Sequence, residues 1–511
     1  MKSTLNRTFL LLAMMATTDG GGLRASDWPQ YRGPGHDGIS TELIRTNWAQ
    51  ETPLRVWRVN IGPGLGSLSI AGGRVFTQVR RYVGNQDSEV CVALNATTGA
   101  ELWATPMGIA DYPDGGVGGD DGPRTTPSVD GGLVYVFSSY LRLFCLNATN
   151  GTVVWSRNFM TELGATLIQW QNAASPLVIG ELVIVNCNAP TGSLMALNKL
   201  TGAVVWRGEN DAMTHATPVY TTAAGVPQVV FFTQTGLASL APASGSVLWR
   251  YTFPYNNISF GASPVVGSNF VYCSGAYGSG AAGVQLTGNG AAVSAAQAWR
   301  TPGANMNHWA TPVFHEGHIY GIYGQSLISL RCIVMATGVE RWRQSLSGQG
   351  AGVLLVSGYL LVTAENGDVI LVRPQPTAYS EVARFNSVNG SVSGVPPKCW
   401  NVPAVSNGRI YHRSTTEAAC YDVAPHLLRL QPLASGNPAA FRLLVSYQDG
   451  SPIPANRVTN IDVVTATNVS LNVTGWIRLT ATPVLTNGQL RVDDTQTLAH
   501  PRRYYRAAER P

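Results

Sequence analysis

The sequence predicts an all-β protein, an eight-bladed β-propeller closed by an N-terminal strand and followed by a small C-terminal β-sandwich-like domain. The first observation behind this prediction is an eleven-residue unit, ALNATTGAELW at residues 93–103. Each copy reads as a strand, a glycine turn and a second strand, and a repeat of about 50 residues indicates a radial array of small sheets. The further copies lie at residues 145–155, 196–206, 239–249 and 332–342.

The second observation is that two independent landmarks give the same number of repeats. One landmark is the aromatic residue that ends the outer strand, and it occupies eight positions. The other is a Ser/Thr-Pro step whose proline lies seven residues before a pair such as Val134-Tyr135. Applying that offset along the chain again gives eight positions, two of which, Leu68 and Val353, have no proline. We expect the aromatic residues to pack between neighbouring blades as structural docking residues. They are Trp57, Trp103, Trp155, Trp206, Trp249, Trp299, Trp342 and Phe385.

The two counts are out of phase at the chain ends, which predicts how the ring closes. Trp57 precedes the first inner-strand landmark, whereas the last repeat ends at Asp422 without a tryptophan after it. Residues 54–59 therefore supply the missing outer strand of the last blade. Closure of this kind removes an open sheet edge that would otherwise template aggregation.

The composition of the blades agrees with this architecture. Runs such as 133–137 (LVYVF) and 229–232 (VVFF) are short, rich in β-branched and aromatic residues, and typical of strands buried on both faces. Helical periodicity is nearly absent. The Thr-Gly pairs at 98–99, 201–202 and 337–338 place glycine where a tight turn needs a positive φ.

The same landmarks divide the chain into five segments. Lys2 and Arg7 precede an apolar run at 9–16, which is too short to span a membrane and predicts a signal peptide. We therefore expect an exported protein, periplasmic or extracellular, with no integral membrane segment in the mature chain. The predicted segments are a signal peptide (1–25), an N-terminal extension (26–44), the propeller (45–425), a linker (426–440) and a β-rich C-terminal module (441–511).

Charge and cysteine positions exclude several classes of function. The net charge is only +5, and the body of the chain has no basic cluster interleaved with aromatic residues, so nucleic acid is not an expected partner. Cys145, Cys332 and Cys420 take a repeat position where other copies have alanine, which indicates small packing residues. Cys399 and Cys420 share a blade and are the best candidates for a disulfide. No Cys-x-x-Cys motif supports a zinc site, a haem attachment or a redox dithiol.

Residues that do not repeat are the candidates for function. Three residues before each inner-strand landmark, the chain places side chains that a propeller brings to one ring around its channel mouth: positions 65, 124, 173, 215, 261, 309, 350 and 400. A cation, imidazoles, amides and aromatic faces around one opening suit an anionic planar ligand or a peptide, and the alternative is a solvated funnel. The candidate ligand-binding residues are Arg124, Asn172, His215, His308, Trp309, Trp400 and Asn401.

Two further features are candidate metal sites. The loop at 111–122 carries four aspartates among glycines, which suits Ca²⁺, although the spacing departs from an EF-hand and a mobile surface loop is the alternative. His315 and His318 flank a Glu-Gly turn that is either a metal contact or a solvated hairpin. No His-Glu-x-x-His or Gly-x-Ser-x-Gly motif supports a hydrolase. The aspartates of the loop are Asp111, Asp114, Asp120 and Asp121.

The repeat unit resembles the docking motif of pyrroloquinoline quinone (PQQ)-type propellers. Residues 27–34 (DWPQYRGP), 122–127 (GPRTTP) and 174–178 (ASPLV) further resemble the exported members common in planctomycetes and verrucomicrobia, and the resemblance covers about residues 27–423. It implies a fold related to quinoprotein alcohol dehydrogenases and to outer-membrane assembly scaffold propellers. The superfamily therefore includes both enzymes and cofactor-free scaffolds.

The resemblance leaves two functions open. The favoured one is a non-catalytic exported scaffold whose channel mouth and top-face loops bind a protein, a glycan or a small ligand. The alternative is a PQQ-dependent dehydrogenase that oxidises alcohols or sugars with Ca²⁺. In that family the quinone lies over calcium held by a Glu, an Asn and an Asp, often beneath a disulfide between adjacent cysteines. This chain has no adjacent cysteines, and its propeller acids lie mostly beside turn glycines.

Overall fold

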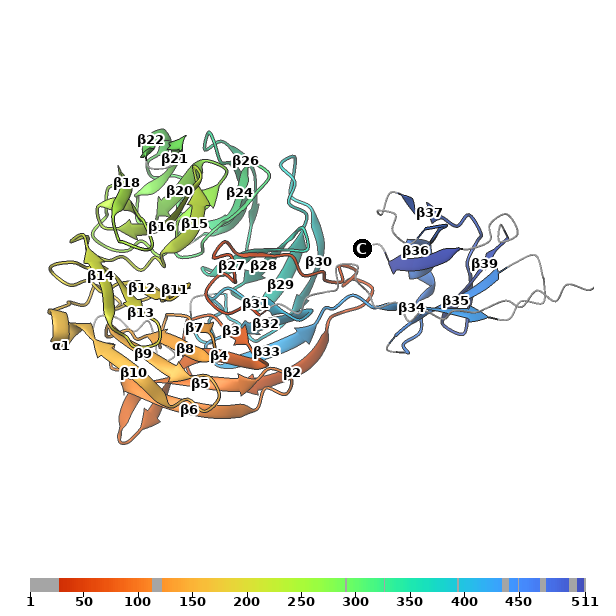
Figure 1. Cartoon of the computed structure of the whole chain (residues 1–511), viewed down its shortest axis with the longest axis horizontal. Coiled ribbons are helices and arrows are strands. Elements are labelled where there is room, and N and C mark those ends of the chain that lie inside the picture. Colours follow the sequence, from red (N-terminus) through yellow and green to blue (C-terminus); the bar gives the residue numbers. More distant parts are fainter. Residues whose placement is uncertain are drawn as a thin grey trace, which may run out of the picture.

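A computed structural model describes residues 27–112, 122–289, 292–325, 327–392, 395–433, 441–448, 450–468, 475–495 and 503–509. The predicted signal peptide lies outside the described residues. Figure 1 shows a ring of sheets joined, through β34, to a separate smaller β-rich unit. No helix in the described part of the chain is long and apolar enough to cross a membrane. The two short helices are α1 (Phe159–Leu163) and the 3-10 helix η1 (Ala455–Asn460).

The ring consists of antiparallel sheets that follow one another along the chain, and in six of them the strand at the channel has only three residues. Between residues 39 and 422 the described chain forms eight such sheets. The first four sheets are β3 (Ser69–Ala71), β4 (Arg74–Val83), β5 (Gln86–Asn95) and β6 (Glu101–Ile109); β7 (Ser128–Asp130), β8 (Leu133–Phe137), β9 (Arg142–Asn147) and β10 (Val153–Asn158); β11 (Leu177–Ile179), β12 (Leu182–Asn186), β13 (Leu194–Asn198) and β14 (Val204–Gly208); and β15 (Val219–Ala223), β16 (Val226–Thr233), β17 (Gly236–Leu240) and β18 (Val247–Thr252).

The remaining sheets keep the same order of strands, and the seventh gains a fifth strand from the N-terminal region. They are β19 (Val265–Gly267), β20 (Phe270–Gly275), β21 (Gly280–Asn289) and β22 (Ala292–Thr301); β23 (Val313–His315), β24 (His318–Tyr323), β25 (Ser329–Val334) and β26 (Glu340–Ser345); β27 (Ala351–Val356), β28 (Tyr359–Ala364), β29 (Asp368–Val372) and β30 (Glu381–Asn386), with β1 (Ile39–Ser40) added beside β27; and β31 (Ala404–Ser406), β32 (Arg409–Arg413), β33 (Glu417–Asp422) and β2 (Leu54–Asn60).

The last sheet closes the ring with a strand from the other end of the propeller. β2 pairs with β33, and Trp57 lies opposite Cys420 in the register. Trp103 lies opposite Ala93 in the same way, so β2 occupies the outer position that the repeat assigns to it. The Arg58 guanidinium also pairs with the Glu417 carboxylate across β2 and β33. This pairing is the one that the mismatch between the two repeat counts predicted.

The docking tryptophans link the outer parts of neighbouring sheets. Six of them donate the indole N–H to a backbone carbonyl of the next sheet at 2.8–3.1 Å. The indole ring lies against the glycine of that turn, as Trp103 does against Gly151. The donor and acceptor residues are Trp57 and Ala96, Trp103 and Ala148, Trp155 and Lys199, Trp206 and Pro242, Trp299 and Met335, and Trp342 and Gln375.

Trp249 and Phe385 occupy docking positions but make other contacts. Trp249 donates its indole N–H to Gln228 Oε1 within its own sheet at 2.7 Å. In the next sheet, the long hairpin of β21 and β22 lies beside β18, the strand that carries Trp249. Phe385 packs edge-on against Trp48, with ring centroids 5.3 Å apart. The repeat therefore predicts where these aromatic residues lie, whereas the neighbouring sheet decides what they contact.

A belt of hydroxyl groups links the inner parts of the sheets, and the Ser/Thr-Pro steps supply it. The hydroxyl of one sheet accepts the backbone N–H of the equivalent residue in the sheet before it, at 2.9–3.1 Å. Sheets that pack face to face share no ladder hydrogen bonds, so these buried N–H groups need such a partner. The five links run from Ser67 to Thr126, Thr126 to Ser175, Ser175 to Thr217, Ser263 to Thr311, and Val402 to Ser67.

The predicted N-terminal extension lies across one end of the ring. Trp28 bridges to β3, His36 contacts an aromatic ring of β15, and β1 pairs in parallel with β27. Between these contacts Arg32 is buried, and its guanidinium donates to the Thr311 carbonyl at 2.8 Å. Because these partners belong to sheets on different sides of the ring, residues 27–40 cover one end of the channel (Figure 1).

All seven cysteines are buried free thiols, so the candidate disulfide between Cys399 and Cys420 is not formed. Cys420 lies opposite Trp57 in the closing pair of strands. The Cys399 thiol lies 3.6 Å from the Asn389 carbonyl oxygen. Burial raises the pKa of both thiols to about 12. Both side chains therefore act as neutral packing groups.

The C-terminal module begins earlier than predicted. β34 (Leu428–Leu433) pairs with β35 (Phe441–Tyr447), so the predicted linker at 426–440 is wrong over 428–433. The reason is that Leu428 and Leu430 alternate along β34 and pack against the module core, which a linker does not do. The module has a second sheet of three strands. Its other strands are β36 (Ile461–Ala466), β37 (Ile477–Arg478), β38 (Val484–Thr486), β39 (Gln489–Asp494) and β40 (Tyr504–Glu509).

The docking contact predicts a measurable difference between two glycines. Gly151 has a φ of +73°, and a Cβ there would lie 2.5 Å from the Trp103 ring. Gly132 has a φ of +81° with nothing within 4 Å of the added carbon. We expect Gly151→Ala to lose about 1–3 kcal/mol more free energy of unfolding than Gly132→Ala, because only the first displaces an indole. Urea denaturation measures both, and equal losses would show that the contact does not matter.

The hydroxyl belt makes a second prediction. Ser175→Ala leaves the buried N–H of Thr126 without its acceptor, which costs about 1–3 kcal/mol. Ser156→Ala, on the exposed outer strand β10, is the matched control and should change stability little. Thermal and urea unfolding of both variants check this, and a Ser175→Ala protein as stable as the control would contradict it.

Candidate binding site at the channel mouth

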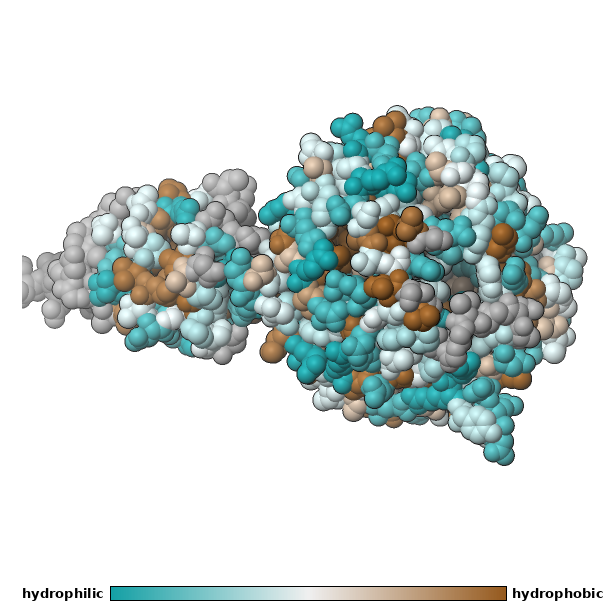
Figure 2. Space-filling model, turned by 180° about the vertical axis from the view of Figure 1, so that it is seen from behind, coloured by the Kyte–Doolittle hydropathy of each residue, from teal (hydrophilic) through white to brown (hydrophobic). Residues whose placement is uncertain are grey.

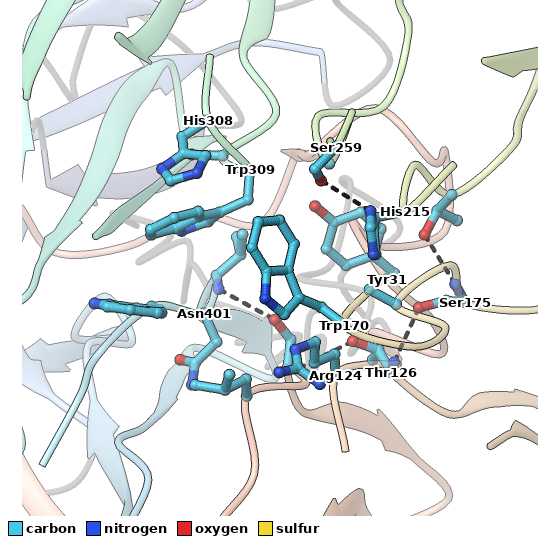
Figure 3. Close-up of a pocket in the computed structure, with 18 of the residues that line it drawn as sticks. Tyr31, Arg124, Thr126, Trp170, Ser175, His215, Ser259, His308, Trp309 and Asn401 are labelled. Atoms are coloured by element: carbon cyan, nitrogen blue, oxygen red, sulfur yellow. Dashed lines mark hydrogen bonds between the residues drawn. The ribbon is translucent and has the colours of Figure 1, made fainter. Parts of the chain in front are cut away.

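A cavity of about 340 Å³ lies in the central channel of the ring (Figure 3). Seven of the eight positions that the sequence places around the channel mouth line it, and Gly350 is the exception. Hydrophobic side chains gather near the centre of the ring on the face that Figure 2 shows. The seven lining residues are Leu65, Arg124, Ala173, His215, Gly261, Trp309 and Trp400.

The cavity is a cup that the N-terminal segment closes from below. Tyr31 lines it, and the Tyr31 hydroxyl lies 3.3 Å from Thr311 Oγ1 of the belt. Thr126, Ser175 and Thr217 of the belt also line the cavity. Residues 27–40 therefore cross the channel on this side of the cup.

Six aromatic side chains form a continuous arc around the cup, which we call the aromatic arc. Successive ring centroids along the arc lie 6.3, 6.3, 5.1, 3.9 and 4.7 Å apart. The rings come from loops of five different sheets, so no single blade contains the arc. Its members, in spatial order, are His215, Trp170, Tyr277, His308, Trp309 and Trp400.

The two imidazoles of the arc are neutral at pH 7. His215 Nε2 lies 2.8 Å from the Gln169 carbonyl, and His215 Nδ1 lies 2.8 Å from Ser259 Oγ. Burial, together with the smaller effect of the positive charge of Arg124, lowers the pKa of His215 to about 4. Burial also lowers the pKa of His308 to about 4. Both rings therefore contribute aromatic surface rather than positive charge.

Arg124 is the charged group that the cup itself presents. Its guanidinium carbon lies 5.9 Å from the centroid of the Tyr112 ring, and the buried Glu89 accepts the Tyr112 hydroxyl at 2.9 Å behind that ring. Burial raises the pKa of Glu89. No aspartate or glutamate is among the described residues that line the cavity. The positive charge of Arg124 interacts with the carboxylate of the buried Glu89.

A second pair of charges lies behind Trp400. The Lys398 ammonium is buried and lies 5.1 Å from the centroid of the indole. The Trp400 indole N–H donates to Glu365 Oε1 at 2.6 Å. These contacts hold the Trp400 ring in place at the end of the aromatic arc, while both charges stay outside the cavity lining.

The two candidate asparagines differ in their roles. Asn401 lines the cavity and is only 3% exposed, and neither its Oδ1 nor its Nδ2 has a hydrogen-bond partner. Asn172 instead donates to the Ser138 carbonyl at 3.2 Å and accepts the Ala174 N–H at 2.9 Å. Its amide stabilises a turn, and Asn172 is not among the residues that line the cavity. Of these two asparagines, only Asn401 lines the cavity.

Three aromatic residues of the lining were not expected from the sequence. Trp170 and Tyr277 adopt left-handed backbone conformations, with φ of 61° and 52°, in loops outside the repeat. Such conformations are unfavourable for large side chains and concentrate at functional sites. Tyr31 belongs to the N-terminal segment. The sequence does contain one indication of this site, because Trp170 is a tryptophan that occupies none of the docking positions.

The described residues contain no group of three or more His, Cys, Asp or Glu side chains that could hold a metal ion. Asp111 accepts the Tyr140 hydroxyl, whereas Asp114, Asp120 and Asp121 lie outside the described residues. His318 Nδ1 is 2.9 Å from the Glu316 carbonyl in its own hairpin. The cup also lacks the carboxylate ligands that Ca²⁺ beneath a quinone requires, so its described lining does not fit that pair of cofactors.

The buried imidazole predicts a pH dependence of stability. Because the pKa of His215 is about 4 in the folded state and about 6.5 when unfolded, the unfolded chain binds more protons between these values. Stability therefore falls as pH drops through this window. We expect His215→Gln to lose less free energy of unfolding between pH 7 and pH 5 than the unmodified protein does. Urea titrations at both pH values test this, and equal losses would contradict it.

Comparison with known proteins places the fold among PQQ-type propellers. Residues 86–314 match the family described as outer membrane protein assembly factor BamB. BamB of Yersinia pestis is 25% identical over 172 residues, which cover 31% of this chain and 37% of that protein. BamB of Salmonella typhimurium is 29% identical over 121 residues, or 22% and 28% of the two chains. The chain thus spans about a third of the length of the curated relatives it matches.

Solved structures agree on the fold. BamB from Moraxella catarrhalis superposes with a TM-score of 0.50 and 16% identity, covering 73% of this chain and 98% of that one. Quinohemoprotein alcohol dehydrogenase from Comamonas testosteroni gives a TM-score of 0.54 and 15% identity, covering 81% and 83%. The predicted resemblance to PQQ-type β-propellers is therefore confirmed at the level of the fold.

Proposed function

We propose that this chain, whose fold is shared with BamB and with quinohemoprotein alcohol dehydrogenases, is an exported, non-catalytic scaffold that binds a partner in the cup at its channel mouth. The observation that carries the proposal is the convergence of the aromatic arc, Arg124 and Asn401 on one cavity. Aromatic rings and arginine supply most of the energy of binding sites, whereas scattered polar residues supply little. The family match over residues 86–314 favours a protein as the partner.

The polar groups of the cup support binding more than catalysis. Each nitrogen of His215 already has a partner, and Thr126, Ser175 and Thr217 are committed to the belt. General acid–base chemistry needs a group that titrates near the working pH and reaches the substrate. The depressed pKa of His215 and the carboxylate-free lining of the described cup do not supply one.

A photo-crosslinking experiment tests this proposal. The reactive residue p-benzoylphenylalanine replaces Gln349, which lines the cup, in cells that produce the protein. We expect a discrete adduct of higher mass after irradiation, because a partner seated at the mouth lies within reach. Replacement of Leu200, which is 54% exposed in the turn between β13 and β14, is the control and should give no such adduct.

Two results would contradict the proposal. One is a Gln349 variant that forms no adduct beyond that of the Leu200 control. The other is purified protein that retains PQQ after incubation with Ca²⁺ and desalting, and then reduces a dye when an alcohol is added. That second result would establish the dehydrogenase instead.

A further inference from the structure

We infer that the open edge of β22 is a self-association surface, at which two copies of this chain pair their β22 strands antiparallel into one continuous sheet. The inference goes beyond the proposed function and does not depend on the cup, because β22 lies on the outer rim of the ring (Figure 1). Three features of the hairpin of β21 and β22 carry it: an edge without exposed charge, a rigid support behind that edge, and a sequence that is complementary to itself.

β22 presents a long and regular sheet edge. It is the end strand of its sheet, where it pairs with β21 on one side. The backbone groups on the other side of an end strand have no ladder partners. At ten residues, β22 is the longest of the eight outer strands of the described ring. Residues 292–297 lie opposite residues 284–289 without a shift in register, so this part of the edge is a template for another strand.

The other seven outer strands carry the features that usually prevent pairing at an edge. Each is shorter than β22 and contains at least one arginine or glutamate. β6, which is nearly as long, also contains Pro106 and two shifts in register. The single charged residue of β22 is Arg300, whose guanidinium donates to the carbonyls of Ala281 and Ser279. Because charge and proline are the usual barriers to edge pairing, β22 is the outer strand that lacks this protection.

Packing against the neighbouring sheet holds the edge in place. Val293 is buried and belongs to the same hydrophobic cluster as Leu286 and Trp249. The Tyr251 hydroxyl of β18 donates to Gln297 Oε1 at 2.8 Å. The strand is therefore ordered before a partner arrives, which lowers the entropic cost of pairing.

A second copy of this chain is the occupant that matches the edge. The sequence from 280 to 299 contains no charged residue, so its complement is an equally uncharged strand. Antiparallel pairing about a twofold axis places one residue of the edge opposite its own copy. With Ala295 at the axis, Ser294 of one copy lies opposite Ala296 of the other. These side chains are small and neutral, so no like charges meet and none obstructs the approach.

The contact is short, and we therefore expect a weak dimer. Each copy contributes residues 293–297 when Ala295 lies at the axis. Stable interfaces bury at least about 1,200 Å², which a single pair of edge segments does not reach. We expect a Kd on the order of 10–100 µM, so the chain is monomeric when dilute and dimeric where it is concentrated.

Two measurements on the full chain test the inference. Sedimentation velocity from about 1 to about 500 µM should show a reversible monomer–dimer equilibrium, because self-association follows mass action. Hydrogen exchange reports which backbone amides pair. The amides of residues 292–297 should exchange more slowly at the high concentration than at the low one, whereas those of β26 should not change.

Charges placed on the edge assign the interface. Ala296 is exposed, and Ala296→Lys should weaken the dimer about tenfold, because like charges then lie within reach across the axis. Ala296→Glu should do the same, and an equimolar mixture of the two variants should dimerise again, since opposite charges meet in the mixed pair. Val154→Lys, at a 50% exposed position of the outer strand β10, is the matched control and should dimerise as the unmodified protein does. Melting temperatures show that each variant is folded.

Several outcomes would overturn the inference. A chain that stays monomeric across this range of concentration does so, and so does a dimer that folded Ala296→Lys leaves unchanged, since the interface would then lie elsewhere. A mixture of the two charged variants that stays as monomeric as each variant alone would show that the loss comes from damage to the strand. Slower exchange at 292–297 that requires another protein would assign the edge to that protein instead. The crosslink at position 349 is independent of these results, so either can fail without the other.

Discussion

The contact between a docking indole and the glycine turn of the next sheet is the constraint on which the rest of this structure depends. Neighbouring sheets of the ring pack face to face and share no ladder hydrogen bonds, so each joint relies on side chains. The indole N–H pairs with a turn carbonyl, and its ring fills the space that a Cβ would need, as at Gly151 and Gly202. The closing strand β2 carries the same contact through Trp57, so the last joint is like the five others that use a tryptophan in this way.

The inner belt of hydroxyls holds the residues of the candidate site at defined positions in the channel. Because Thr126 and Thr217 are held by backbone hydrogen bonds at one height in the channel, the residues two positions before them, Arg124 and His215, are also held at one level. The belt therefore supplies positions, and the side chains placed on it need not resemble one another. This separation explains how a repeated framework can carry a cup whose lining does not repeat.

Burial determines the electrostatic character of the cup. It keeps His215 and His308 neutral, and it places Glu89 and Glu365 behind aromatic rings rather than in the lining. Arg124 is then the charged side chain among the described residues of the lining, although the whole chain is only mildly basic. In a cavity of low polarity a charge acts more strongly than on an open surface.

The sequence by itself determined the strands, the closing strand and seven of the cavity positions, because a repeat keeps a constant offset between the Ser/Thr-Pro step and the residues before it. Tertiary structure alone decided the rest. Trp170 and Tyr277 lie in loops outside the repeat, and Tyr31 reaches the cup because Arg32 anchors its segment across the channel. Tertiary structure also decided that the amide of Asn172 pairs within its own turn rather than in the cavity lining.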